Sequence, residues 1–204
     1  MTRTALPGIL AMAAIVVASN ILVQFLLGPW LTWGALTYPL AFLVTDLMNR
    51  IYGPSQARQV VLVGFIVGVF CSLVAASLDA TTLRIAVGSG IAFLAAQMLD
   101  VAVFDRLRRG RWWTAPLAST LLGSTLDTAL FFSIAFSAAL NAAEPATAPV
   151  WAQETLPLLG VGPVVPLWVS LAVADWGVKL ALALVALVPF RLIVAAVSGP
   201  AKIS

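Results

Sequence analysis

The chain has 204 residues, of which 62% are hydrophobic and only 9% are charged, and its mean hydropathy is +1.06. Soluble domains carry about 25% charged residues, so this composition excludes a water-soluble globule. The absence of histidine and the single cysteine, Cys71, exclude histidine bases, His or Cys metal cages and disulfide frameworks. Basic residues scattered between apolar runs do not form a phosphate-binding patch. We expect a membrane protein without metal, cofactor or nucleic-acid partner.

Six apolar runs are long enough to cross a hydrocarbon core about 30 Å thick as helices. They cover residues 6–27, 31–49, 59–78, 85–104, 113–140 and 164–189. Unpaired backbone amides are costly in lipid, so each run is predicted to be a helix, and the alternation of a transmembrane β-barrel is absent. The predicted fold class is all-α, a polytopic membrane protein with six transmembrane helices. Residues 1–204 are expected to form a single bundle.

The first two runs introduce polar groups into the apolar pattern. Run 6–27 is too long and uninterrupted for a secretory signal, so we expect it to be a retained helix, with Asn20 and Gln24 on it. In run 31–49, Pro39 removes a backbone hydrogen bond and is expected to kink the helix. One face of this second helix carries polar and aromatic side chains, namely Tyr38, Phe42, Thr45, Asp46 and Asn49.

The later runs carry polar stripes at helical spacing. Run 59–78 has none and shows only small residues typical of close packing. The stripes of the next two runs step by three and four residues and can face a shared cavity. They are Gly90, Phe93, Gln97, Asp100 and Phe104 in run 85–104, and Thr120, Ser124 and Asp127 in run 113–140. The last run adds Asp175 and Lys179, with Trp168 two turns before.

The basic residues predict the orientation of the bundle. In a six-span arrangement, one side of the membrane holds only Arg84. The other side holds Arg3, Arg50, Arg58, Arg106, Arg108, Arg109, Arg111, Arg191 and Lys202. Because cytoplasmic loops are enriched in Lys and Arg, both termini are predicted to be cytoplasmic. The tryptophans agree, with Trp30, Trp33, Trp151 and Trp168 at the outer boundary and Trp112 and Trp113 at the inner one.

Acidic groups outnumber basic groups inside the predicted spans. The carboxylates are Asp46, Asp100, Asp127 and Asp175, and the cations are Arg50 and Lys179. An ionisable group in a span costs about 2.5–3.5 kcal/mol on insertion scales, so such groups are functional candidates. At least two negative charges therefore need a proton, a ligand donor or an outside partner.

Structural explanations compete with a functional one for several of these residues. Asp46 with Arg50, and Asp175 with Lys179, have the (i, i+4) spacing of intrahelical ion pairs, whereas Asp100 and Asp127 have no such partner. Asn20 is equally suited to hydrogen bonds between helices. The aromatic residues at helical spacing are more often packing than stacking groups.

The chemistry of the polar stripes suits a flat heterocycle with exposed N–H groups. Carboxylates accept paired N–H donors, amides both donate and accept, and aromatic faces stack on rings. A guanine-like base fits this description. A polyamine or a proton relay would also use surplus carboxylates.

Four segments of the chain resemble the queuosine precursor transporters of the vitamin uptake transporter family. They are SNILVQ (19–24), TWGALTYPLAFLVTDLMNRIYG (32–53), QMLDVAVFDRLRRGRWWTAPLASTLLGSTLDTALFFSIAF (97–136) and DWGVK (175–179). The resemblance implies a six-helix protein of the bacterial inner membrane that imports 7-cyano-7-deazaguanine, and also its 7-aminomethyl relative, for queuosine salvage in tRNA. The family's recurring polar positions map onto Asn20, Asp46, Arg50, Gln97, Asp100, Asp127, Asp175 and Lys179.

We therefore predict a permease that does no chemistry on its substrate. The expected substrate-binding residues are Asn20, Phe42, Asp46, Arg50, Phe93, Gln97, Asp100, Ser124, Asp127, Asp175 and Lys179. No GxxxxGK[ST] run exists, so the chain is not its own P-loop ATPase. The alternatives are a substrate-binding subunit of an ATPase-energised vitamin uptake system, an intramembrane enzyme using Asp100 with Asp127, and a structural protein. The expected partners are the base and the lipid bilayer, and a homo-oligomer is left open.

Overall fold

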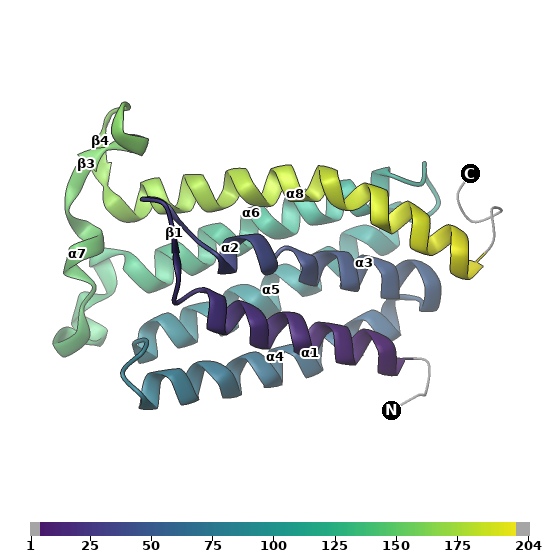
Figure 1. Ribbon diagram of the computed structural model, residues 1–204, viewed down its shortest axis with the longest axis horizontal. Helices are drawn as coiled ribbons and strands as arrows, with labels where there is room; N and C mark the ends of the chain where they lie inside the picture. The colour runs from purple at the N-terminus through teal and green to yellow at the C-terminus, as the bar shows by residue number, and fades with distance from the viewer. Residues whose placement is uncertain (1–4, 199–204) are drawn as a thin grey trace.

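The computed structural model describes residues 5–198, so Arg3 and Lys202 of the orientation prediction lie outside the described residues. Long helices dominate the fold (Figure 1). The elements in chain order are α1 (Leu6–Leu22), β1 (Leu26–Leu27), β2 (Leu31–Thr32), α2 (Gly34–Thr37), α3 (Leu40–Tyr52), α4 (Pro54–Ser77), α5 (Leu83–Leu107), α6 (Thr114–Phe136), η2 (Ala138–Ala143), η3 (Pro145–Thr147), α7 (Val150–Gln153), β3 (Thr155–Pro157), η4 (Leu158–Gly160), β4 (Val164–Pro166) and α8 (Leu167–Ser198).

The predicted all-α class is confirmed. The strands form only two short antiparallel pairs, β1 with β2 and β3 with β4. The helices α4, α5, α6 and α8 are long and apolar enough to cross a membrane, and α1 is a shorter apolar helix. The count of six spans, which also includes α1 and the α2–α3 pair, stays a prediction.

The first predicted helix is five residues shorter than expected. α1 ends at Leu22, and Leu26–Leu27 pairs with Leu31–Thr32 instead of continuing the helix to residue 27. The reason lies in the turn between these strands, where Gly28 adopts a φ of 72° and Pro29 has no amide hydrogen to donate. The chain therefore reverses near the end of the bundle.

The second run is interrupted at Pro39, as the sequence predicts. α2 ends at Thr37 and α3 begins at Leu40, with Pro39 as its N-cap residue. Because proline lacks an amide hydrogen, the helical hydrogen-bond pattern is broken here. Tyr38 lies at this break, packed edge to face against Phe93 of α5 with ring centroids 6.0 Å apart.

Two boundaries near the C-terminal half also differ from the prediction. α6 ends at Phe136 because Ser137 adopts an extended backbone, so Leu140 lies in η2 rather than in the helix. The last run begins as strand β4, and α8 then continues through Pro189 to Ser198. A proline inside a membrane helix is tolerated where neighbouring groups compensate the freed carbonyl, so it does not end the helix.

The helices α5 and α6 form the centre of the bundle. They pack extensively against each other, with α8 along one edge, α1 and α4 along the other, and α3 between (Figure 1). In an apolar 18-residue window of each helix, 44% of the residues of α5 and 39% of those of α6 are buried, against 22% for α4 and 17% for α8. Large apolar side chains such as Ile66 and Val185 are exposed on the outer helices. Such an apolar outer surface is what a lipid-facing helix requires.

The two ends of the bundle differ in their basic residues. α3, α5 and α8 end, and α4 and α6 begin, at the end opposite the short strands and α7 (Figure 1). Arg84 lies at the strand end, near the start of α5, where its guanidinium donates to the backbone carbonyls of Ile134 and Ser137 and to Asn141 Oδ1. These contacts join α5 to the end of α6 and the loop that follows, so Arg84 has a structural role.

Candidate functional site

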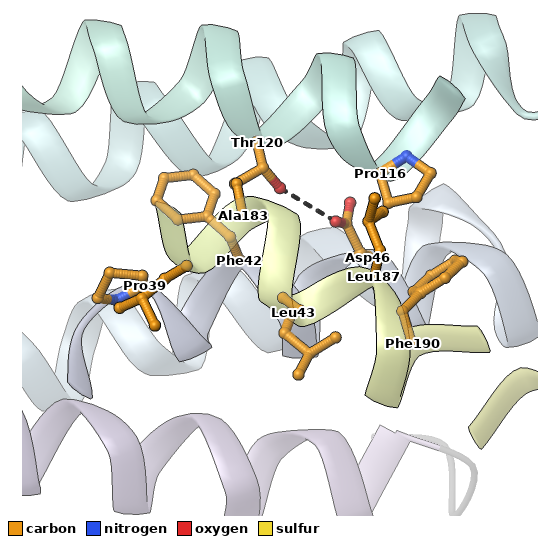
Figure 2. Close-up of a pocket in the computed structure, with 11 residues that line it drawn as sticks. Pro39, Phe42, Leu43, Asp46, Pro116, Thr120, Ala183, Leu187 and Phe190 are labelled. Atoms are coloured by element: carbon orange, nitrogen blue, oxygen red, sulfur yellow. Dashed lines mark hydrogen bonds between the residues drawn. The ribbon is translucent and has the colours of Figure 1, made fainter. Parts of the chain in front are cut away.

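The carboxylate of Asp46 lies at the interface of α3 with α6. Ser119 donates a hydroxyl hydrogen bond to Oδ1 at 3.0 Å. Thr120 donates one to Oδ2 at 3.1 Å, which Figure 2 shows as a dashed line. Asp46 is 3% exposed. Both oxygens of this carboxylate therefore accept hydrogen bonds from hydroxyl groups of α6.

Asp100 of α5 lies beside Asp46 and Ser119 and is fully buried. Neither of its oxygens accepts a hydrogen bond from any residue within 5–198. Gly123 of α6 makes this close packing feasible, because a Cβ there would lie 2.7 Å from Phe42 Cε1 and 3.4 Å from Asp100 Cβ. The bundle thus buries two adjacent acids, one of which has no hydrogen-bond partner among the described residues.

Unused amide groups extend this region along α3 and α5. Thr45 donates to Gln97 Oε1 at 2.6 Å, and Asn49 Nδ2 donates to the Val101 carbonyl at 3.0 Å. In the part of the chain that the structure describes, Gln97 Nε2 and Asn49 Oδ1 are buried without a partner. We call Asp46, Asp100, Gln97, Asn49, Thr45, Ser119 and Thr120 the acid-pair region. It offers an unused N–H donor and several unused oxygen acceptors within one packed interface.

A small pocket opens beside Asp46, between α3, α6 and α8 (Figure 2). Its free volume of about 10 Å³ holds about one water molecule. The residues that line it are Pro39, Phe42, Leu43, Asp46, Pro116, Thr120, Leu182, Ala183, Ala186, Leu187 and Phe190. Apolar side chains of α8 therefore close this pocket on the Asp46 side of the acid-pair region.

A second polar region joins α6 to α8. Lys179 Nζ lies 2.7 Å from Asp127 Oδ2 and 2.5 Å from Asp175 Oδ2, and Tyr38 donates to Asp127 Oδ1 at 3.1 Å. Thr128 donates to Asp175 and also receives a hydrogen bond from Lys179. We call these five residues the lysine cluster. The Asp175–Lys179 pair that the (i, i+4) spacing allows is present. Asp127 also has a partner, which the sequence did not show because it lies on another helix.

The intrahelical Asp46–Arg50 ion pair, which the (i, i+4) spacing allows as a structural alternative, is not formed. Arg50 donates to the carbonyls of Arg108 at 2.8 Å and Trp112 at 3.4 Å, and its guanidinium lies over the ring of Phe104. Its long side chain reaches the connection between α5 and α6 rather than folding back along α3. Within residues 5–198, neither Asp46 nor Asp100 forms a salt bridge.

Of the remaining predicted site residues, one lines the pocket and the others make packing or hydrogen-bond contacts within the bundle. Phe42 lines the pocket, whereas Phe93 packs in an apolar core against Tyr38. Ser124 donates to the Thr120 carbonyl within α6. Asn20 donates to the Val16 carbonyl and accepts from Ser72, so it joins α1 to α4, as the interhelical alternative predicted. The structure brings Phe42, Gln97 and the acid pair together but leaves Asn20 apart from them.

The sequence reasoning missed Ser119 as a site residue and left Tyr38 and Thr45 out of the expected set. Ser119 lies four residues before Gly123 and eight before Asp127, so it falls on the same helix face as the acid. That spacing is the signal by which it could have been found. Tyr38 and Thr45 share the polar face of the second run, but the contact of Tyr38 with Asp127 depends on how the break at Pro39 packs against α6.

A metal site and the acid–base pair of an intramembrane enzyme can also be compared with this geometry. Among residues 5–198, no group of three or more carboxylate or cysteine side chains could hold a metal ion. The Asp100–Asp127 pair that an intramembrane enzyme would require is not hydrogen-bonded, since Asp127 bonds to Lys179 and Tyr38. The acid that lies beside Asp100 is Asp46.

Comparison with known families decides the identity at family level. A family model described as "Putative vitamin uptake transporter" matches residues 32–194, which include both polar regions. The chain belongs to this family. The family is described as a transporter family rather than an enzyme family, and the apolar helices agree with a multi-pass membrane protein. The prediction of a membrane transporter rather than an enzyme is confirmed.

Three curated relatives carry closely related names. The "Queuosine precursor transporter" of Escherichia coli (strain K12) is 40% identical over an alignment of 139 residues, covering 59% of this chain and 63% of the relative. A "Probable queuosine precursor transporter" of Haemophilus influenzae is 38% identical, covering 60% and 57%, and one of Bacillus subtilis is 32% identical, covering 53% and 58%. The matches thus span less than two thirds of each relative's length. No solved structure matches the chain.

Proposed function

We propose that this chain is a permease that imports a queuosine precursor, 7-cyano-7-deazaguanine and also its 7-aminomethyl relative, across the bacterial inner membrane. Family membership and the names of the curated relatives support transport of this substrate class. The acid-pair region supports a binding site for a guanine-like base. In this proposal the protein changes conformation around the base and does no chemistry on it.

Asp100 is the observation on which the proposal rests. Its carboxylate is fully buried with both oxygens unused among the described residues, and burying such a group costs several kcal/mol. The paired N–H donors of a guanine-like edge satisfy a carboxylate, and the unused Nε2 of Gln97 is a donor for the ring carbonyl. Phe42, at the pocket, is the ring that stacks on the base.

Transport requires the closed pocket to open. A site that holds about one water cannot hold a bicyclic base, so α8 has to separate from α3 and α6 for the base to enter. The α8 side of the pocket consists of apolar side chains from Leu182 to Phe190, which slide or separate without breaking polar contacts. Lys179 lies one turn before this segment on α8. In the proposal, the contacts of the lysine cluster are kept while the pocket opens.

We further propose six membrane passes, formed by α1, the α2–α3 pair, α4, α5, α6 and α8. Arg58, Arg106, Arg109, Arg111 and Arg191 gather at the end of the bundle opposite Arg84, which supports a cytoplasmic location for that end. The interrupted second pass is compatible with a membrane because irregular backbone is tolerated where it is buried in protein.

The test is an uptake assay with a matched pair of variants. Purified protein is reconstituted alone into liposomes, and entry of radiolabelled 7-cyano-7-deazaguanine is measured for wild type, Asp100→Asn and Asp105→Asn. Both aspartates lie on α5, but the side chain of Asp105 is 41% exposed and pairs with Arg108. Asp100→Asn replaces one acceptor oxygen by a donor, which mismatches the N–H edge, so uptake should fall by about 10- to 100-fold.

The outcomes separate the candidate functions. Uptake by wild-type liposomes shows that no ATPase module is required. Asp105→Asn should transport at the wild-type rate. Wild-type rates for Asp100→Asn, at equal amounts of folded protein, would remove Asp100 from the site, and the absence of uptake in every sample would contradict the permease proposal itself.

A further inference from the structure

The acid-pair region poses a charge problem that the lysine cluster does not. Asp46 and Asp100 are 3% and 0% exposed, and neither forms a salt bridge within residues 5–198. Two adjacent carboxylates in a buried site cannot both be ionised without a cation. A proton is the smallest cation that resolves this problem in a pocket with room for about one water.

The hydrogen bonds indicate which acid holds this proton. Each oxygen of Asp46 accepts a hydroxyl hydrogen bond, from Ser119 at 3.0 Å and from Thr120 at 3.1 Å. Hydrogen bonds donated to a carboxylate favour its charged form. Asp100 receives no such hydrogen bond from the described residues, so the hydrogen-bond geometry favours the proton on Asp100 and the charge on Asp46.

The other charged groups around the pair do not replace the proton. On α3, Arg50 is held by the carbonyls of Arg108 and Trp112. Asp127 of α6 and Asp175 of α8 share Lys179. Arg191 of α8 lies over the ring of Trp112. The charged residues that α5 adds are Arg84, Arg106 and the exposed Asp105, all near its ends, and α4 adds only Arg58, in its first turns.

We propose that Asp46 and Asp100 form a proton-binding site, and that the closed conformation of the transporter holds one proton there. When α8 separates, water reaches the pair, both carboxylates ionise, and the proton leaves to solvent. Closing the pocket takes a proton up again. This inference deepens the proposed function, on which it rests for the identity of the cargo, and adds that closure of the carrier is linked to pH.

The release of a proton on opening determines the sign and size of the pH dependence of the opening equilibrium. If opening releases one proton, the open-to-closed ratio rises tenfold for each pH unit over the range in which the pair exchanges its proton. Alkaline conditions therefore favour the open form. Replacing one acid of the pair by its amide removes the second charge, so the opening equilibrium loses this dependence on pH.

A cysteine in the pocket measures the open fraction directly. Ala183 lines the pocket on α8 and is 5% exposed, so Ala183→Cys in a Cys71→Ser background is labelled only when the pocket opens. The exposed Ala80→Cys in the same background corrects for the intrinsic reactivity of a thiol at each pH. Labelling rates are recorded for the purified, detergent-solubilised protein between about pH 6 and about pH 9.

The proposal predicts that the corrected labelling rate rises about tenfold per pH unit in part of this range. Asp46→Asn and Asp100→Asn, each combined with the reporter, should abolish that slope, while Asp105→Asn should keep it. A flat corrected rate in the otherwise wild-type reporter protein overturns the proton site, and so does an unchanged slope in both amide variants. A separate experiment adds 7-cyano-7-deazaguanine. If the base protects the introduced pocket thiol from labelling, it binds there, whether or not the labelling rate depends on pH.

Discussion

The acid-pair region and the lysine cluster both combine two aspartates with hydroxyl groups, but only the lysine cluster contains a cation. Both place aspartates and hydroxyl groups at helix interfaces that involve α6. Asp46, Asp100, Asp127 and Lys179 are buried, whereas the side chain of Asp175 is partly exposed. In the lysine cluster a single ammonium lies within 2.7 Å of two carboxylates. In the acid-pair region, two carboxylates lie together with no salt bridge among the described residues.

This difference separates a structural role from a transport role. A buried ion pair with its hydrogen bonds complete resists change, because removal of one partner leaves an uncompensated charge. An acid with no partner gains from any donor that reaches it, whether a proton or a substrate N–H group. The lysine cluster therefore fixes α8 against α6, and the acid-pair region is the part of the interface that binds and releases.

The largest effect is expected from removing the cation of the lysine cluster. Lys179→Met leaves Asp127 and Asp175 facing each other without compensation, which should destabilise the protein by about 3–5 kcal/mol. The measurement is thermal unfolding in detergent, followed by the loss of helical circular dichroism. The triple variant Lys179→Met, Asp127→Asn, Asp175→Asn should recover most of this loss, because it removes the unpaired charges as well.

Asp100→Asn in the same unfolding assay measures how much the acid-pair region contributes to stability, for comparison with Lys179→Met. It breaks no ion pair, so its unfolding temperature should equal or exceed that of wild type. If Lys179→Met unfolds like wild type while Asp100→Asn is strongly destabilised, the roles assigned to the two regions are reversed.

A smaller effect is expected from changing the packing next to the acid pair. A Cβ at Gly123 would lie 2.7 Å from Phe42 Cε1, so Gly123→Ala should cost about 1–3 kcal/mol and force α6 away from α3 and α5. Uptake should fall with it, because the same contact positions Asp100.

Gly177→Ala on α8 is the matched control. Its new Cβ meets no described atom within 4 Å, so the better helix propensity of alanine should leave stability unchanged or raise it by about 0.5–1 kcal/mol. Equal unfolding temperatures for the two variants would contradict this packing argument.

Much of the acid-pair region could be predicted from the sequence. The cost of placing an ionisable group in lipid selected Asp46 and Asp100. The spacing of three and four residues added Gln97, which shares a helix face with Asp100. The break at Pro39 was predictable for the same kind of reason, since it depends on one residue and its own backbone. The all-α class needed only composition and run length.

Contacts between distant helices could not be predicted in this way. Asp127 looked unpartnered because Lys179 lies 52 residues away, and only the packing of α8 on α6 brings the two together. Arg50 looked paired with Asp46 because an (i, i+4) spacing permits that contact, but the carbonyls of the next connection compete for the guanidinium. Local patterns specify which face a residue occupies, whereas its partner depends on tertiary packing.

The smallest effect should come from Asn20, whose neutral contacts lie outside both charged regions. Asn20→Ala removes the hydrogen bonds to the Val16 carbonyl and from Ser72, and polar contacts between membrane helices average about 0.6 kcal/mol. We expect a slight loss of stability and wild-type uptake in liposomes. Asn49→Ala is the matched control in the acid-pair region, where the same residue type has an unused oxygen, and it should reduce uptake. If Asn20→Ala abolishes uptake in folded protein while Asn49→Ala does not, the substrate path runs along α1 and α4, and the binding region has been placed on the wrong side of α5.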